Sequence, residues 1–201
     1  MQNDNLRPLV FSWLIKILNF NKSLRNIENS ITKYIPILLE YITKNNLHLQ
    51  YQTLEFLLSI STSYSKALKG YENAIMKALL SIATDDNNQL LWFIYEILLN
   101  LFHNSTIDDS LIEQSLGDTV KLVNSSKLQG NALGPILNYL EICSKRINAT
   151  KVISYLQILT NFPNCNLNQA KAIAILASSG GVEGTILKDM TNKVTLKLYI
   201  S

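Results

Sequence analysis

The chain has 201 residues, of which 47% are hydrophobic and 16% are charged. This length allows one or two compact domains, or one piece of a longer repeat array. With only 7 Gly and 4 Pro, an all-β chain full of tight turns is disfavoured, and long runs of Leu and Ile favour helices. The formal net charge of +3 is spread along the chain without a dense basic run, which argues against nucleic-acid binding.

The compartment is indicated by the cysteines and by the N-terminus. Cys143 and Cys165 lie in separate predicted helical regions without a CxxC partner, which predicts two buried free thiols in a reducing compartment. The N-terminus lacks the basic-then-apolar layout of a signal peptide, and no apolar run reaches about 18 residues without polar interruption. We therefore expect a cytoplasmic or nuclear protein that does not bind membranes.

Apolar residues recur at steps of three and four along most of the chain, which is the pattern of amphipathic helices. Pro36 lies inside one such stretch and predicts either a kink or a helix start near Tyr34. Side chains between Asp85 and Asn88 are expected to cap the helix that follows them. In chain order, the expected helices cover about residues 9–20, 27–44, 48–63, 71–83 and 89–103. A capped start at residues 106–109 leads into a helix with Leu116, Val120 and Val123, and the helices 128–140 and 152–159 follow. The first helix of a last pair carries Ile173, Leu176 and Ala177.

One class of helix is marked by an apolar anchor residue that recurs about every 40 residues, and each anchor is followed three and four positions later by an apolar pair. The anchors are Leu14, Leu54, Ile94, Leu133 and Ile173. Helix pairs with this period are typical of HEAT and armadillo repeats. We therefore predict an all-α fold, a right-handed α-solenoid of about four to five HEAT-like helix pairs, in which stacking buries faces that one pair cannot cover.

We expect the whole chain, residues 1–201, to be one HEAT-repeat segment of a longer solenoid. The first expected helix lacks its partner, and the chain stops partway into a further helix at Val194 to Ser201, without the polar outer face of a capping repeat. The approximate repeats are 1–20 (partial), 24–63, 70–103, 107–148, 150–180 and 182–201 (partial).

The residues that could carry chemistry are better explained by structure. His48 and His103 are expected near helix ends, where a solvated or capping role is the simpler reading. The acidic pairs Asp85–Asp86 and Asp108–Asp109 stand at helix starts and complement the helix dipole there. The glycine-rich stretch 178–184 follows a helix and lacks the Gly-Lys-Ser/Thr ending of a phosphate loop, so we read it as a helix C-terminal cap. We predict no catalytic, metal or cofactor site, no small-molecule substrate and no enzymatic activity.

The aromatic residues and two of the glycines are expected to take part in helix packing. Trp13, Trp92 and the tyrosines fall among helical stripes and are expected mostly in the core. Gly130 and Gly134, at the start of the helix 128–140, are expected where neighbouring helices approach closely.

Six polar residues are candidates for a protein-contact surface, with simple solvation as the equal alternative. The second helices of successive pairs usually line the concave face of such solenoids. On that basis the candidates are Lys16, Gln52, Asn100, Asn131, Asn138 and Lys171.

The sequences of three segments resemble those of a known protein family. Ser126-Lys-Leu-Gln-Gly-Asn-Ala-Leu133, followed by an apolar helix, resembles the Leu-Gln-Gly-Gly-Ala-Leu helix start in the middle of the cullin-associated, neddylation-dissociated protein family. Residues 35–45 are similar to its Val-Pro-Ile-Leu…Arg-Lys-Asn segment, and Lys171-Ala-Ile-Ala with residues 184–190 is similar to the next one. The order holds over nearly the whole chain. The chain departs from the family in a shorter polar linker before residue 194 and in bulkier residues at 92–95.

The resemblance implies the middle of a long HEAT solenoid that wraps around a cullin–RING scaffold lacking its ubiquitin-like modification. That family promotes exchange of substrate-receptor modules on SCF-type and related ubiquitin ligases, by competitive binding and steric exclusion. The expected function is therefore a protein-binding scaffold for ubiquitin ligase assembly, and no contact residue is carried over. The alternatives are another HEAT scaffold, such as a nuclear-transport receptor or a phosphatase scaffold subunit, and, least favoured, an all-helical enzyme.

Overall fold

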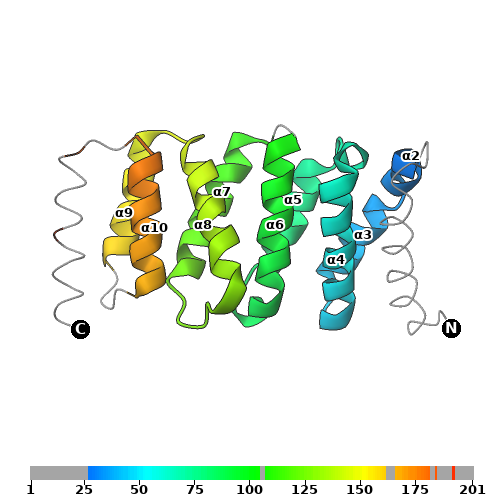
Figure 1. Cartoon of the computed structure of the whole chain (residues 1–201), viewed down its shortest axis with the longest axis horizontal. Coiled ribbons are helices and arrows are strands. Elements are labelled where there is room, and N and C mark those ends of the chain that lie inside the picture. Colours follow the sequence, from blue (N-terminus) through cyan, green and yellow to red (C-terminus); the bar gives the residue numbers. More distant parts are fainter. Residues whose placement is uncertain (1–26, 105–106, 162–165, 182–183, 185–191, 193–201) are drawn as a thin grey trace. The chain divides into compact units, whose positions relative to one another are not determined.

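A computed structural model describes residues 27–104, 107–161, 166–181, 184 and 192, and the statements below concern these residues (Figure 1). The chain forms two compact units, Met1–Ile107 (unit 1) and Asp108–Ser201 (unit 2). Within the described ranges every regular element is a helix. The prediction of an all-α fold is confirmed.

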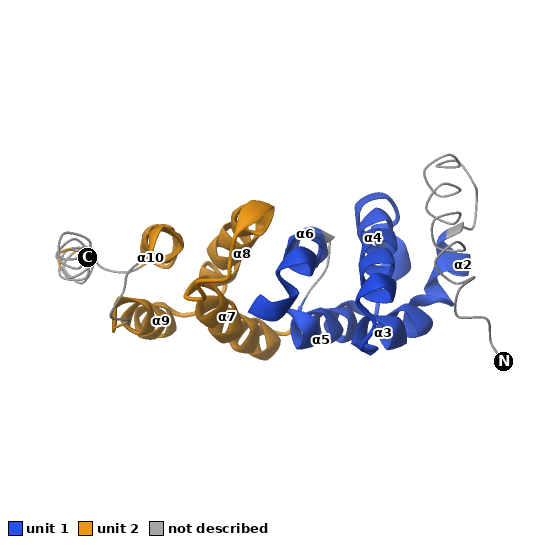
Figure 2. Cartoon of the chain, turned by 90° about the horizontal axis from the view of Figure 1, so that it is seen from below, with its two compact units in different colours: residues 1–107 blue, residues 108–201 orange. Residues whose placement is uncertain are grey.

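Unit 1 is a two-layer stack of helix pairs (blue in Figure 2). The first helices of the pairs, α3 and α5, pack against each other, and so do the second helices, α4 and α6. Each second helix also packs against its own first helix. The elements are α2 (Ile27–Thr32), α3 (Ile35–Thr43), α4 (Leu47–Ser63), η1 (Ser65–Leu68), α5 (Glu72–Ile82), η2 (Asp85–Asn87) and α6 (Asn88–Asn104).

Unit 2 repeats this architecture (orange in Figure 2). The first helices α7 and α9 pack together, and so do the second helices α8 and α10. Within each pair, the second helix packs against the first, α8 against α7 and α10 against α9. The elements are α7 (Asp109–Val123), η3 (Gly130–Ala132), α8 (Leu133–Ser144), α9 (Ala149–Asn161) and α10 (Leu167–Ser179). Helix pairs stacked layer on layer are the packing of an α-solenoid, as the repeat predicted.

Pro36 divides the expected helix 27–44 into two. Helix α2 ends at Thr32, and α3 starts at Ile35 with Tyr34 at its N-cap position and Pro36 in its first turn. Proline lacks the N–H that a helix interior needs, but the first turn leaves that group unbonded in any case. The predicted start near Tyr34 is confirmed.

The predicted anchor residues mark the core. Leu54 and Ile94 are fully buried and Ile173 is nearly so. Leu133 is only half-buried because it is the first residue of α8. Leu14 lies outside the described residues.

A side-chain amide closes the turn in three of the four helix pairs. Gln50 Nε2 donates to the carbonyl of Ile42 at 2.9 Å, and Asn87 Nδ2 donates to the carbonyl of Ile82 at 3.1 Å. Gln169 Nε2 likewise donates to the carbonyl of Leu159. Each bond goes to a carbonyl near the C-terminal end of the first helix, where the helix itself supplies no partner. The turn and the pair are therefore fixed by the same residue.

The pair α7–α8 is tied within its core instead. The hydroxyls of Ser115 and Tyr139 lie 2.6 Å apart, and both side chains are fully buried. A buried hydrogen bond of this kind orients one helix against the other, since either hydroxyl left alone would carry a desolvation cost.

The predicted close approaches at Gly130 and Gly134 are wrong. A Cβ atom added to either residue would meet nothing within 4 Å. Gly130 has φ +79°, a left-handed conformation in the turn before α8, so glycine serves the turn there. The close approach lies at Gly180, where an added Cβ would meet Val152 Cγ1 at 2.5 Å.

The acidic pairs lie at helix starts as predicted, whereas the expected side-chain cap by Asp108 is wrong. Asp85 and Asp86 belong to the short 3-10 helix η2, and α6 begins only after it, at Asn88. Asp108 does occupy the N-cap position of α7, but its side chain makes no capping hydrogen bond. Asp109 accepts from Arg146 Nη2 at 3.0 Å. Asp85 and Asp86 thus belong to the turn before α6, and Asp109 forms an ion pair with Arg146.

Candidate protein-binding surface

The second helices of unit 1, α4 and α6, lie side by side and run in the same direction. Near their starts, the rings of Tyr51 and Phe93 meet with centroids 4.9 Å apart. Near their ends, Asn100 Nδ2 donates to Ser61 Oγ at 3.0 Å and to Thr62 Oγ1 at 3.2 Å. These contacts fix which residues of the two helices stand at the same level.

The solvent face of these helices carries an aromatic cluster, formed by Tyr51, Trp92 and Phe93. Phe93 makes edge-to-face contacts with both partners, at 4.9 Å between ring centroids in each case. Tyr51 remains 43% exposed and Trp92 36%. Edge-to-face pairs hold the rings in place while leaving their outer surfaces open to water.

The prediction that Trp92 belongs to the core is wrong, and the sequence contained the signal. Trp92 lies at helical spacing from Gln89, Glu96 and His103, which form the polar stripe of α6. Tyr51 lies in the same way in the polar stripe of α4, with His48 and Glu55. An aromatic residue within a polar stripe faces solvent. Tyr95, on the apolar side of α6, is buried as expected.

The face around the cluster is acidic, although the chain as a whole is basic. Helices α4 and α6 contain no Lys or Arg, and their acidic residues are Glu55 and Glu96. Glu55 follows Tyr51 by four residues and Glu96 follows Trp92 by four, so each carboxylate lies one helical turn beyond an exposed ring. His48 and His103 are exposed, one at each end of this face.

The burial pattern aligns Tyr51 with Trp92 and Glu55 with Glu96. This offset is one residue longer than the spacing of the anchors Leu54 and Ile94. Leu54 and Ile94 are therefore not equivalent positions of the two helices, although both are buried. The two helices therefore display the same doublet, an aromatic ring followed one turn later by a glutamate.

The second helices of unit 2 present a different surface. Apart from Leu167, the first residue of α10, which is 67% exposed, the exposed residues of α8 and α10 are small or polar. They include Gly134, Asn138, Lys171, Ala174 and Ser178. The single aromatic residue of α8, Tyr139, is buried, and α10 has none. No aromatic ring is exposed on either second helix of this unit.

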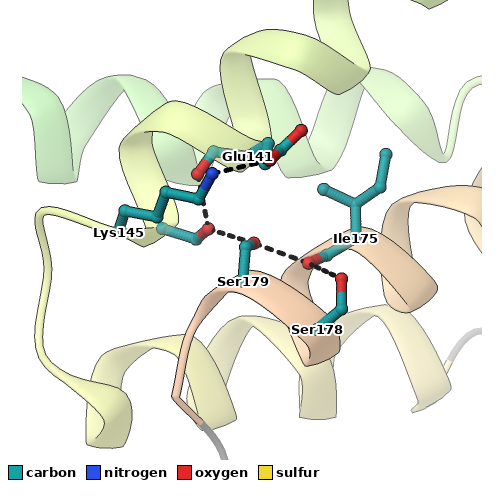
Figure 3. Close-up of polar contacts among 6 residues, drawn as sticks. Glu141, Lys145, Ile175, Ser178 and Ser179 are labelled. Atoms are coloured by element: carbon teal, nitrogen blue, oxygen red, sulfur yellow. Dashed lines mark hydrogen bonds and ion pairs between the residues drawn. The ribbon is translucent and has the colours of Figure 1, made fainter.

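Figure 3 shows how α8 and α10 are joined at their C-terminal ends. The hydroxyls of Ser144 and Ser179 lie 2.6 Å apart, and each is also bonded to a carbonyl of its own helix. Lys145 Nζ pairs with Glu141 Oε1 at 2.6 Å on the surface beside them. This link plays the part in unit 2 that Asn100 plays in unit 1.

The six predicted contact residues fall into different environments. Asn131, Asn138 and Lys171 are exposed in unit 2, the first in η3 and the others on the second helices. Asn100 is half-buried, and its side-chain amide donates the hydrogen bond that links α6 to α4. Gln52 is half-buried on α4. Its Oε1 is buried and accepts no hydrogen bond among the described atoms. Lys16 lies outside the described residues.

Metal-binding side chains do not gather within the described part of the chain. Over these residues no group of three or more His, Cys, Asp or Glu side chains could hold a metal ion. Cys143 is buried and unpaired, and burial raises the pKa of its thiol to about 12. Cys165 lies outside the described residues. None of the described helices combines the length and apolar character needed to cross a membrane.

The glycine-rich stretch after α10 ends the helix, as predicted for its first part. The N–H of Gly180 donates to the carbonyl of Leu176 at 3.0 Å, and Gly181 follows with φ +63°. Such a pair of glycines is a usual way to stop a helix. Residues 182 and 183 lie outside the described ranges.

No protein-family model matches the chain, and neither does any curated protein or solved structure. The fold itself defines the class, an all-α protein of stacked helix pairs. Function must therefore be argued from the surface of the second helices.

Proposed function

We propose that the protein is a non-enzymatic, protein-binding scaffold, and that the second-helix face of unit 1 contacts the partner. The observation that carries this proposal is the aromatic cluster. Two of its rings are exposed on a helix layer that needs neither of them to close its core. Tyrosine and tryptophan supply large contact area with few rotatable bonds, and they are enriched among the residues that dominate binding energy.

The fold supports the same conclusion. Stacked helix pairs place second helices in a row and so form extended binding surfaces without a catalytic centre. The link from Asn100 to Ser61 and Thr62 fixes α4 against α6 and keeps the face rigid. A rigid face loses little conformational entropy when a partner binds.

The partner class rests on the resemblance of residues 35–45 and 126–133 to the cullin-associated, neddylation-dissociated family. On that basis we propose a cullin–RING scaffold without its ubiquitin-like modification as the partner. The protein would then act in the cytoplasm or nucleus, in the exchange of substrate receptors on these ligases, by occupying the scaffold.

A pull-down with purified components tests both parts. The immobilised full chain should retain an unmodified cullin–RING complex and should retain much less of the modified complex. The double variant Tyr51→Ala/Trp92→Ala should lose retention. The matched variant Asn138→Ala/Lys171→Ala, which changes the corresponding layer of unit 2, should keep it.

The outcomes separate the parts of the proposal. If neither cullin form is retained, the cullin assignment is wrong. If the complex is retained equally by the Tyr51→Ala/Trp92→Ala variant, the contact face is wrong.

A further inference from the structure

The two ring-and-carboxylate doublets of unit 1, Tyr51 with Glu55 and Trp92 with Glu96, share one solvent face. Each pair is separated by four residues on a helix, which places the ring and the carboxylate about one turn apart on the same side. The contacts from Tyr51 to Phe93 and from Asn100 to Thr62 show that the two helices lie side by side and run in the same direction. The two doublets therefore lie on neighbouring helices of one solvent face.

The charges of this face are not neutralised within the described chain. No lysine or arginine lies on α4 or α6, and Glu55 and Glu96 take part in none of the ion pairs between described residues. Three other described glutamates form ion pairs: Glu40 with Lys44, Glu113 with Lys151 and Glu141 with Lys145. The unit 1 face therefore combines open rings with uncompensated negative charge.

We propose that this face binds a basic peptide segment of a partner protein, with one arginine seated on each doublet. A guanidinium plane stacks on an aromatic ring and also donates two hydrogen bonds to a carboxylate, so ring and glutamate one turn apart suit it better than they suit lysine. Adjacent packed helices lie about 8–10 Å apart, and alternate residues of an extended peptide lie about 7 Å apart. Two arginines separated by one residue can thus reach both doublets.

This inference rests on the proposed contact face and adds the chemistry of what it binds. Charge complementarity is its basis, because the face is acidic on a chain of net charge +3. The same charge pattern makes the binding sensitive to salt, since exposed ion pairs are screened within about 8 Å at physiological ionic strength.

Fluorescence titration of the full chain tests the inference. Trp13→Phe leaves Trp92 as the sole tryptophan of the chain, which has 2. The titrants are Gly/Ser-flanked peptides with the cores Arg-Gly-Arg, Lys-Gly-Lys, Gln-Gly-Gln and Glu-Gly-Glu. We expect the arginine peptide to change Trp92 emission in a saturable way, the lysine peptide to bind several-fold more weakly, and the neutral and acidic peptides not to bind.

Two charge variants provide the matched comparison. Glu55→Gln/Glu96→Gln keeps the shape of the face and should weaken arginine-peptide binding at least about tenfold, since each lost doublet is worth roughly a factor of a few. Glu28→Gln/Asp118→Asn removes two acidic charges from other helices and should change the affinity less than about twofold.

The possible results are distinct from those of the pull-down. Equal binding of neutral and arginine peptides, or unchanged affinity in Glu55→Gln/Glu96→Gln, overturns the basic-segment assignment while leaving the contact face intact. No binding of any peptide also overturns it, and the pull-down still decides the contact face. Concentration-dependent dimerisation that Trp92→Ala abolishes would show instead that a second copy of this chain occupies the face.

Discussion

The two units share their interior design and differ on their second-helix surface. In unit 1, α4 and α6 expose Tyr51 and Trp92 next to unpaired glutamates. In unit 2, α8 and α10 expose small and polar residues and a single aliphatic side chain, Leu167, and the described glutamate of that layer, Glu141, is paired with Lys145. Stability requires only that the buried sides match. The residues on the outer sides can therefore differ between the units. The exposed rings of unit 1 are the feature that distinguishes its surface as a candidate binding site.

The interior of unit 2 can be tested most strongly at Gly180. An added Cβ there would meet Val152 Cγ1 at 2.5 Å and the carbonyl oxygen of Leu176 at 2.8 Å. We expect Gly180→Ala to lower the free energy of unfolding by about 1–3 kcal/mol because of this overpacking. Urea denaturation followed by circular dichroism measures it.

The control for that variant is Gly134→Ala. The position lies in α8, and an added Cβ meets nothing within 4 Å. We expect a change of no more than about 0.5 kcal/mol, because the gain in helix propensity is opposed by the contact of the new Cβ with the ring of Pro135. Equal losses in both variants would contradict the close approach of α9 and α10 at Gly180.

The hydrogen bond that joins the two helices of a pair can be removed at the two buried glutamines, Gln50 in unit 1 and Gln169 in unit 2. Gln50→Leu removes one hydrogen bond to the preceding helix and should cost about 1 kcal/mol. Gln169→Leu should cost more, about 2 kcal/mol, because Gln169 Oε1 also accepts from the N–H of Asn166 in a capping box. In both cases the freed carbonyl stays buried against the pair. A neutral effect at both sites, in the same urea assay, would show that the amides do not stabilise the pairs.

The sequence predicted the helices well because local signals define them. Pro36 divides α2 from α3, and the apolar stripes of α4 and α6 place those helices within a residue or two of their bounds. Stacking followed from the repeat, since one pair cannot cover its own apolar face.

The surface was harder to predict, because side-chain exposure depends on what packs alongside. The expectation that Trp92 lies in the core rests on its place among the helical stripes, although its polar neighbours at helical spacing place it outside. Gly130 and Gly134 were assigned to helix contacts, whereas the contact belongs to Gly180, which nothing in a single sequence distinguishes. The role of Asn100 depends on Ser61, 39 residues away.

The links between second helices should contribute less than the glutamines. Asn100→Ala removes the hydrogen bonds to Ser61 and Thr62, and Ser179→Ala removes the bond to Ser144. We expect losses of about 1 kcal/mol or less in each unit, since these groups are partly exposed to water. A much larger loss in unit 1 would mean that the link helps to hold the unit together and does not merely orient the face.

Cys143 should affect stability only at alkaline pH. Its folded pKa of about 12 lies above the ordinary value of 9.0 because the thiol is buried. The neutral thiol is favoured in the folded state, so its contribution is complete below about pH 9 and is lost progressively as pH rises toward 12. Unfolding free energies at pH 7 to 10.5 should fall more steeply for the native chain than for Cys143→Ala. Parallel pH curves would contradict the burial of the thiol.

The central claim is that unit 1, and not unit 2, offers its second helices to a partner. Amide hydrogen exchange of the full chain, with and without saturating Arg-Gly-Arg peptide, tests it most directly. We predict slower exchange in the segments 47–63 and 88–104, with no change in 133–144 and 167–179. Protection confined to unit 2, or none in α4 and α6, would contradict the account.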